Sequence, residues 1–126
     1  MMRPYQHSDY PIISSWGKVP PTGFFPVDTS FVYESEGRPL LFVSLYLTNT
    51  KDVCLVEHFI GDPERKGAER RLATQTVQAF LESYARDRGY ARLLCFTNVD
   101  SLKAHYKGLG YSETSAGHSI FVKEVL

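Results

Sequence analysis

The sequence predicts an α+β domain with a mixed, mostly antiparallel sheet and helices on both faces. Apolar runs rich in Val, Leu, Phe and Tyr recur through the first half of the chain, which is typical of antiparallel strands. A helical apolar period at about 68–88 then lies between strand-like runs at 53–60 and 91–97. A strand, a helix and a strand in this order indicate one right-handed crossover between parallel strands.

Turn residues and apolar runs define the elements of the first half. A short strand at 3–6 precedes a helix over 9–16, with Asp9 as its N-cap and Pro11 in its first turn. The Gly and Pro residues between 17 and 28 indicate an irregular connection. The runs 31–34 and 40–47 form a predicted hairpin. Because the second run is almost wholly apolar, both of its faces should be covered.

The second half begins with the longest predicted helix. Its apolar positions recur at helical spacing, and Gly89 fits the left-handed position just past its end. A shorter helix containing Tyr106 follows the 91–97 strand, and Gly110-Tyr111 turns the chain towards a last strand at 118–125. We expect one domain over 1–126, large enough to bury about two thirds of its unfolded surface.

The composition argues against several classes of protein. Fourteen basic and 14 acidic residues give zero net charge, so no long-range field favours nucleic acid or an anionic membrane. No apolar run reaches the roughly 20 residues that span a bilayer. The first residues lack the apolar core of a secretion signal, so we expect a cytoplasmic protein. Cys54 and Cys95 lie in apolar runs without metal-ligand spacing, which predicts buried, reduced thiols and no metal site.

Tyr106 stands four residues before Gly110-Tyr111, in a helix that follows a strand. This arrangement resembles the C-terminal half of GNAT-type (Gcn5-related) N-acetyltransferases, and the predicted element order resembles the whole GNAT fold. The resemblance implies acetyl transfer from acetyl-CoA to a primary amine of a small molecule or peptide. It also implies that Tyr106 lies beside the thioester sulfur. Asn98 would correspond to the family's Asn after the fifth strand, although it lies one residue further from Tyr106 than is usual.

GNAT enzymes bind the coenzyme pyrophosphate through (Q/R)-x-x-G-x-(G/A) at the start of the long helix, where backbone N–H groups and the helix dipole favour an anion. If Gly67 takes the first glycine position, Glu69 takes the second. Counting back from Gly89 instead places the motif at 70–74, without a glycine. Both registers stay open. Four basic residues cluster here, and they indicate either a phosphate site or a solvated charged face: Arg65, Lys66, Arg70 and Arg71.

Catalysis needs a proton acceptor, a proton donor and an oxyanion donor. Glu57, inside an apolar strand, is the candidate base, with an ion-paired or exposed Glu as the alternative. His58 is adjacent, so we expect it on the opposite face, as a satisfied or surface histidine. Tyr106 is the candidate acid, with a core aromatic as the alternative. The resemblance implies coenzyme contacts from Phe59, Ile60, Gly61, Arg65, Lys66, Gly67, Ala68, Arg70, Arg71, Asn98 and Tyr106.

The departures from the loop motif keep a second hypothesis open. A catalytically inactive GNAT-like domain, serving as a ligand-binding or protein-interaction module, would keep the fold and lose the phosphate loop. The substrate side of an active enzyme would be formed by the 16–28 and 48–52 segments. The edge of a last strand at 118–125 could pair with a second copy to form a homodimer.

Overall fold

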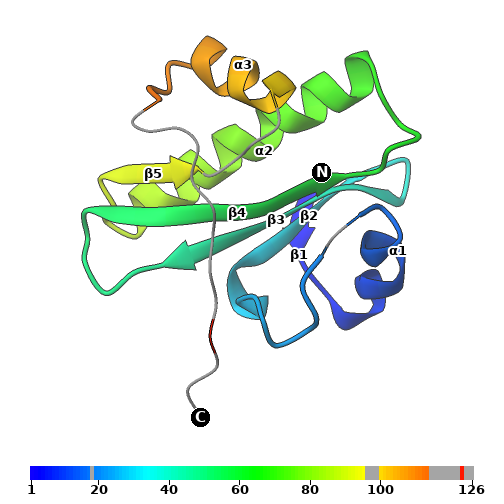
Figure 1. Cartoon of the computed structure of the whole chain (residues 1–126), viewed down its shortest axis with the longest axis horizontal. Helices are drawn as coiled ribbons and strands as arrows, with labels where there is room; N and C mark the ends of the chain where they lie inside the picture. Colours follow the sequence, from blue (N-terminus) through cyan, green and yellow to red (C-terminus); the bar gives the residue numbers. More distant parts are fainter. Residues whose placement is uncertain (18, 96–99, 114–122, 124–126) are drawn as a thin grey trace. The chain divides into compact units, whose positions relative to one another are not determined.

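The structure is a computed structural model that describes residues 1–17, 19–95, 100–113 and 123 (Figure 1). The chain divides into two compact units, Met1–Cys95 and 96–126. The first unit contains the sheet and the helices α1 and α2. The described part of the second unit contains the helix α3 (Asp100–Gly108). The last strand expected at 118–125 lies outside the described residues, and a single domain over 1–126 stays a prediction.

The sheet of the first unit has five strands in sequential order. Pairing is antiparallel from β1 to β4 and parallel between β4 and β5, with α2 as the connection. The predicted mixed sheet with one parallel crossover is therefore confirmed. The strands are β1 (Met2–Pro4), β2 (Ser30–Ser35), β3 (Arg38–Leu47), β4 (Val53–Gly61) and β5 (Arg92–Cys95).

The loop between β2 and β3 has two central residues, Glu36 and Gly37, with φ values of 56° and 74°. Two-residue hairpin loops adopt positive φ at both positions because this backbone follows the twist of the strands. The loop joins the paired residues Ser35 and Arg38, so the predicted hairpin is confirmed.

Two apolar clusters cover the two faces of this sheet. The helices α2 and α1 lie on opposite sides of it (Figure 1). α2 (Ala68–Asp87) contributes its buried stripe to one cluster, and α1 (Tyr10–Ser14) contributes Ile13 to the other. The 3-10 turns η1 (His7–Asp9) and η2 (Val27–Thr29) precede α1 and β2. Residues 40–45 of β3 are at most 1% exposed, which confirms that this strand is covered on both faces.

α2 ends as the sequence predicts. Gly89 has a φ of 83°, its N–H donates to the Arg86 carbonyl, and the Tyr90 N–H donates to the Ala85 carbonyl. These two bonds form a Schellman motif, which satisfies carbonyls that the end of a helix leaves without partners. The Tyr90 hydroxyl then donates to the Thr48 carbonyl over 2.6 Å, which joins the end of α2 to the β3–β4 turn.

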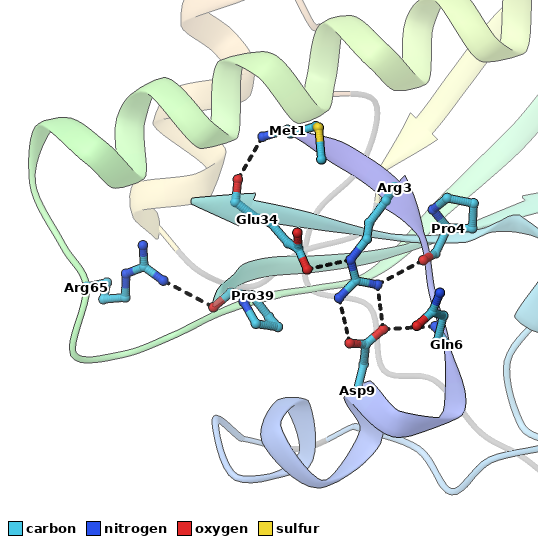
Figure 2. A network of polar contacts seen from close by, with 8 residues as sticks. All are labelled: Met1, Arg3, Pro4, Gln6, Asp9, Glu34, Pro39 and Arg65. Atoms are coloured by element: carbon cyan, nitrogen blue, oxygen red, sulfur yellow. Dashed lines mark hydrogen bonds and ion pairs between the residues drawn. The ribbon is translucent and has the colours of Figure 1, made fainter. Parts of the chain in front are cut away.

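A partly buried ion pair holds the N-terminal segment on the sheet (Figure 2). Arg3 donates two hydrogen bonds to the Asp9 carboxylate, at 2.7 and 2.8 Å, and a third to Glu34 on β2 at 2.7 Å. The Asp9 carboxylate also accepts a hydrogen bond from the backbone N–H of Gln6. Asp9 was expected as the N-cap of the helix over 9–16, and it stands at the N-cap position of α1. Its carboxylate makes no capping bond to α1, however, because it accepts from the Gln6 backbone N–H in the turn η1 and binds Arg3.

Candidate active site

β4 contains a bulge at the point where the sequence places the catalytic base. Ser44 on β3 pairs with Glu57, whereas Phe42 pairs with Ile60, so β4 has one extra residue between them. His58 has a φ of 57° in the left-handed region, which is uncommon for a residue other than glycine. Such bulges bend a strand and redirect its side chains.

The bulge corrects the expectation that Glu57 and His58 lie on opposite faces. The centroid of the His58 ring lies 5.7 Å from that of the Tyr46 ring and 6.4 Å from that of the Phe25 ring. Tyr46 and Phe25 both belong to the cluster on the α1 face. Its Nε2 atom is 4.0 Å from Oε2 of Glu57. Strict alternation fails here because His58 leaves the extended conformation on which it depends. Both side chains are partly buried.

The end of β4 offers backbone N–H groups on the side away from β3. The Asp62 N–H donates to the Leu40 carbonyl of β3, and N–H groups alternate between the two edges of a strand. The Ile60 N–H therefore faces β3, and the Gly61 N–H faces the other edge. β4 is paired with β5 from Val53 to Val56. The resemblance implies coenzyme contacts from Phe59, Ile60 and Gly61, and a backbone N–H among them would be the oxyanion donor. The Ile60 N–H is directed to β3, while Gly61 and the bulge residue Phe59 stay candidates.

The first turn of α2 follows a glycine. Gly67 is the N-cap, with φ 84° and ψ −143°, and the first intrahelical bond runs from the Arg71 N–H to its carbonyl. An L side chain is strained in this backbone conformation. Because the helix begins at Ala68, Gly67 occupies the position that a phosphate-binding glycine would take. The alternative register at 70–74 lies inside the helix.

Glu69, the residue that departs from the loop motif, is bound to neighbouring groups. Its carboxylate accepts from Arg65 at 3.1 and 3.2 Å and from the Ser35 hydroxyl at 2.9 Å. These bonds lower the pKa of Glu69, so the carboxylate stays ionised, and the Arg65 guanidinium compensates its charge. The Arg65 guanidinium also donates to the Pro39 carbonyl (Figure 2) and to the Ser35 carbonyl. Arg65 therefore fastens the loop to the β2–β3 hairpin, whereas Lys66 and Arg71 are exposed.

Arg70 lies against the end of β4. It donates to the Asp62 carbonyl, its Nε atom is buried without a described partner, and burial lowers its pKa. A Cβ atom on Gly61 would come within 2.5 Å of the Arg70 Cζ atom and of a Leu41 methyl group. A side chain at position 61 would therefore displace the Arg70 guanidinium and the Leu41 methyl group that pack against this end of β4.

Gly61→Ala should lower the free energy of unfolding by about 1–3 kcal/mol, because the new methyl group overpacks this contact. Chemical denaturation followed by circular dichroism measures the change. Gly108→Ala in α3 is the matched control, since no described atom lies within 4 Å of its Cβ position. That change should stabilise the helix by up to about 1 kcal/mol. Equal effects of the two changes would contradict the close approach at Gly61.

Tyr106 occupies a defined place at the end of α3 in the second unit. The Tyr111 N–H donates to its carbonyl over 3.0 Å, the Gly110 N–H donates to the Lys107 carbonyl, and Gly110 has a φ of 88°. The rings of Tyr106 and Tyr111 lie 5.3 Å apart. This is a Schellman motif with its usual side-chain contact. Tyr106 is 7% exposed, and its catalytic role stays a prediction. Asn98 lies outside the described residues.

The described residues include neither a cluster suited to a metal ion nor a helix suited to a membrane. No group of three or more His, Cys, Asp or Glu residues in this part of the chain could hold a metal ion. Among the described helices, none combines the length and the apolar character needed to cross a bilayer.

Solved structures share this arrangement of strands and helices. A GNAT family acetyltransferase from Streptococcus pneumoniae aligns over 98% of this chain and 97% of its own, with a TM-score of 0.71 and 9% identity. The ribosomal-protein-S18-alanine N-acetyltransferase of Escherichia coli aligns over 91% and 79%, with a TM-score of 0.70 and 16% identity. The fold is that of the GNAT acetyltransferases. No protein-family model and no curated protein matches the chain.

The GNAT fold also occurs in larger proteins. N-acetylglutamate synthase from Neisseria gonorrhoeae, complexed with coenzyme A and N-acetyl-glutamate, aligns over 83% of this chain with a TM-score of 0.69 and 15% identity. This chain spans only 27% of that synthase. Within the GNAT fold of this chain, the sequence alone did not reveal the pair formed by Tyr46 and His58. The Tyr46 hydroxyl lies 2.7 Å from the His58 Nε2 atom, and the bulge that joins them has no local sequence signal.

Proposed function

We propose that this protein is an acyl-CoA-dependent N-acetyltransferase that transfers an acetyl group to a primary amine of a small molecule or peptide. One observation carries the proposal: in a GNAT fold, a bulged strand with an outward Gly61 N–H leads into a helix whose N-cap is Gly67. The first-turn N–H groups of such a helix attract phosphate oxygens. The outward Gly61 N–H would hydrogen-bond a thioester oxygen as it gains charge.

The chain's own residues divide the work in this proposal. Lys66 and Arg71, which are exposed beside the N-terminus of α2, would hold phosphate groups of acetyl-CoA. Tyr106 would give a proton to the leaving sulfur, and a base on β4, for which Glu57 is the candidate from sequence, would take one from the amine. The proposal includes a cytoplasmic location and no nucleic-acid partner, in keeping with the zero net charge.

A second candidate function is a GNAT-like module that binds a ligand or a protein without catalysis. Two bonded side chains favour it, because Arg65 is held by Glu69 and Arg70 is held by the Asp62 carbonyl. Both guanidinium groups therefore already have hydrogen-bond partners within the protein. The two candidate functions differ in whether acetyl-CoA binds.

Acetyl-CoA should bind and raise the melting temperature of the wild-type protein. At 100 times its dissociation constant it would add about 2.7 kcal/mol to the stability. Lys66→Ala combined with Arg71→Ala should weaken binding roughly tenfold, at about 0.7 kcal/mol per exposed charge. Isothermal calorimetry and melting curves measure both effects.

Arg86→Ala, at the opposite end of α2, is the matched control and should bind like the wild type. Arg70 is left in place because it packs against Gly61. If millimolar acetyl-CoA leaves the wild-type melting curve unmoved, the acetyltransferase proposal fails and the non-catalytic module is favoured.

A further inference from the structure

A phenol, an imidazole and a carboxylate meet on the α1 face of the sheet. The Tyr46 hydroxyl is 2.7 Å from the His58 Nε2 atom and 3.3 Å from the Phe24 carbonyl oxygen. The Glu57 Oε2 atom is 4.0 Å from the same Nε2 atom. Three separate segments therefore converge here: β3, the bulge of β4, and the connection before η2.

One arrangement of protons satisfies both printed contacts of the Tyr46 hydroxyl with protein groups. A tyrosine hydroxyl has one proton to donate, and Tyr46 lies near two acceptors. If Nε2 of His58 carries a proton, it donates to the Tyr46 oxygen, and Tyr46 donates to the Phe24 carbonyl. Both contacts are then satisfied. The lone pair of the ring is left on Nδ1, for which the described residues provide no hydrogen-bond partner.

We infer that His58, oriented by Tyr46, accepts the proton of the amine through Nδ1, and that Glu57 stabilises the imidazolium that forms. This inference rests on the proposed function and assigns its base to His58 instead of Glu57. Tyr46 is a positioning residue, since it acts through the imidazole. The left-handed backbone of His58 places its ring on the same face as Tyr46 and Glu57. Without the bulge, the ring would point to the other face of the sheet.

The charges around His58 suit a base that works near neutral pH. Burial lowers its pKa from the ordinary value of 6.5, and the Glu57 carboxylate partly opposes this shift. Among the described residues, the titratable groups that face the ring are Tyr46 and Glu57, and Phe25 covers it with an uncharged ring. The imidazole is therefore neutral at pH 7 and able to accept a proton.

The surroundings also indicate the class of amine. Phe25 lies 6.4 Å from the His58 ring, and the neighbouring Phe24 is 58% exposed. Exposed aromatic side chains bind apolar groups, while the Glu57 carboxylate attracts a cation. A primary amine on an aromatic or other apolar group fits both features, and phenethylamine is a simple probe of this class.

The ammonium group attracted by Glu57 first releases one proton to water. The nitrogen of the neutral amine then forms a bond to the thioester carbonyl carbon and passes one proton to Nδ1 of His58. The carbon–sulfur bond breaks, and the sulfur leaves with its electron pair and takes a proton from the proposed acid, Tyr106. His58 then releases its proton to water, and Tyr106 regains one from water. The products are the N-acetyl amide and the free thiol.

Rates of thiol release with acetyl-CoA and phenethylamine test the assignment. His58→Gln should lower kcat about 10²-fold or more at pH 7 with little change in KM for acetyl-CoA, because it removes the base. His7→Gln, which changes an exposed histidine in the turn η1, is the matched control and should keep the wild-type rate.

The pH profile separates His58 from Glu57. The wild-type kcat should fall as the pH drops through the lowered pKa of His58, below 6.5. Glu57→Gln should keep this acid limb and move it to lower pH, because the carboxylate raises the pKa of the imidazole. Loss of the limb in Glu57→Gln, or an unchanged kcat in His58→Gln, would assign the base elsewhere and overturn the inference.

An NMR titration of the histidine ring signals keeps the test independent of turnover. Phenethylamine should shift the His58 signals of the wild-type protein and leave those of His7 in place. If acetyl-CoA does not bind but this shift occurs, the transfer proposal fails and the amine site stands. If acetyl-CoA is turned over and His58 neither shifts nor affects kcat, the transfer proposal stands and this inference falls.

Discussion

Tyr106→Phe should reduce kcat by about 10²-fold or more while acetyl-CoA binding and stability change little. The substitution deletes the hydroxyl, which is the proposed proton donor to the leaving sulfur. It keeps the ring that packs 5.3 Å from Tyr111 and the backbone bonds that close α3. If Tyr106 had only a structural role, loss of its hydroxyl would leave kcat unchanged.

Tyr111→Phe is the matched control for this measurement. It removes the other hydroxyl of the same ring pair and should leave kcat unchanged. Initial rates of thiol release and melting curves of both variants decide between the two roles. A loss of stability in Tyr106→Phe with an unchanged kcat would identify Tyr106 as a packing residue.

Asp9→Asn should lower the free energy of unfolding by about 3 kcal/mol at pH 7, because it leaves Arg3 without its buried carboxylate. Burial alone would raise the pKa of Asp9, but hydrogen bonds from Arg3 and the Gln6 amide outweigh it and lower the pKa below 3.8. The carboxylate therefore contributes its full stability above pH 3.8, and this contribution is lost as the pH falls through the lowered pKa.

Denaturation curves at pH 7 and in acid measure this contribution. The difference between wild type and Asp9→Asn should shrink in acid, because the wild-type carboxyl is then protonated. Glu82→Gln, which changes an exposed carboxylate on α2, is the control and should remain within about 0.5 kcal/mol of the wild type. A loss of equal size at both pH values would show that the charge of Asp9 is not what stabilises the fold.

Local signals explain what the sequence predicts well. The apolar period of α2 and the glycine at position 89 set the helix within one or two residues of its observed bounds. Both signals act between neighbours in the chain. The same holds for the β2–β3 hairpin, whose turn residues are consecutive. The order of these elements then leads to the parallel crossover, because few connections are compatible with it.

Contacts between distant residues explain what the sequence does not predict. The bulge at His58 depends on how β4 pairs with β3, and Glu57 was assigned to the wrong face relative to His58 for this reason. Arg65 and Glu69 are i,i+4 neighbours, but the Ser35 hydroxyl that joins them is 34 residues from Glu69. Asp9 stands at the N-cap position of α1, but its carboxylate binds Arg3 instead of an N–H group of that helix, which local capping preferences do not reveal.

The extra residue in β4 reverses which positions of the strand are buried beneath α2. Cys54 and Val56 belong to the cluster on that side before the bulge, and Phe59 joins it afterwards, so even positions give way to an odd one. In a regular strand, deletion of one residue turns every later side chain to the wrong layer. Deletion of His58 would instead restore simple alternation and keep each neighbour in its layer. One residue can therefore be removed from β4 at this position without turning the later side chains to the wrong face of the sheet. Only the His58 imidazole would be lost.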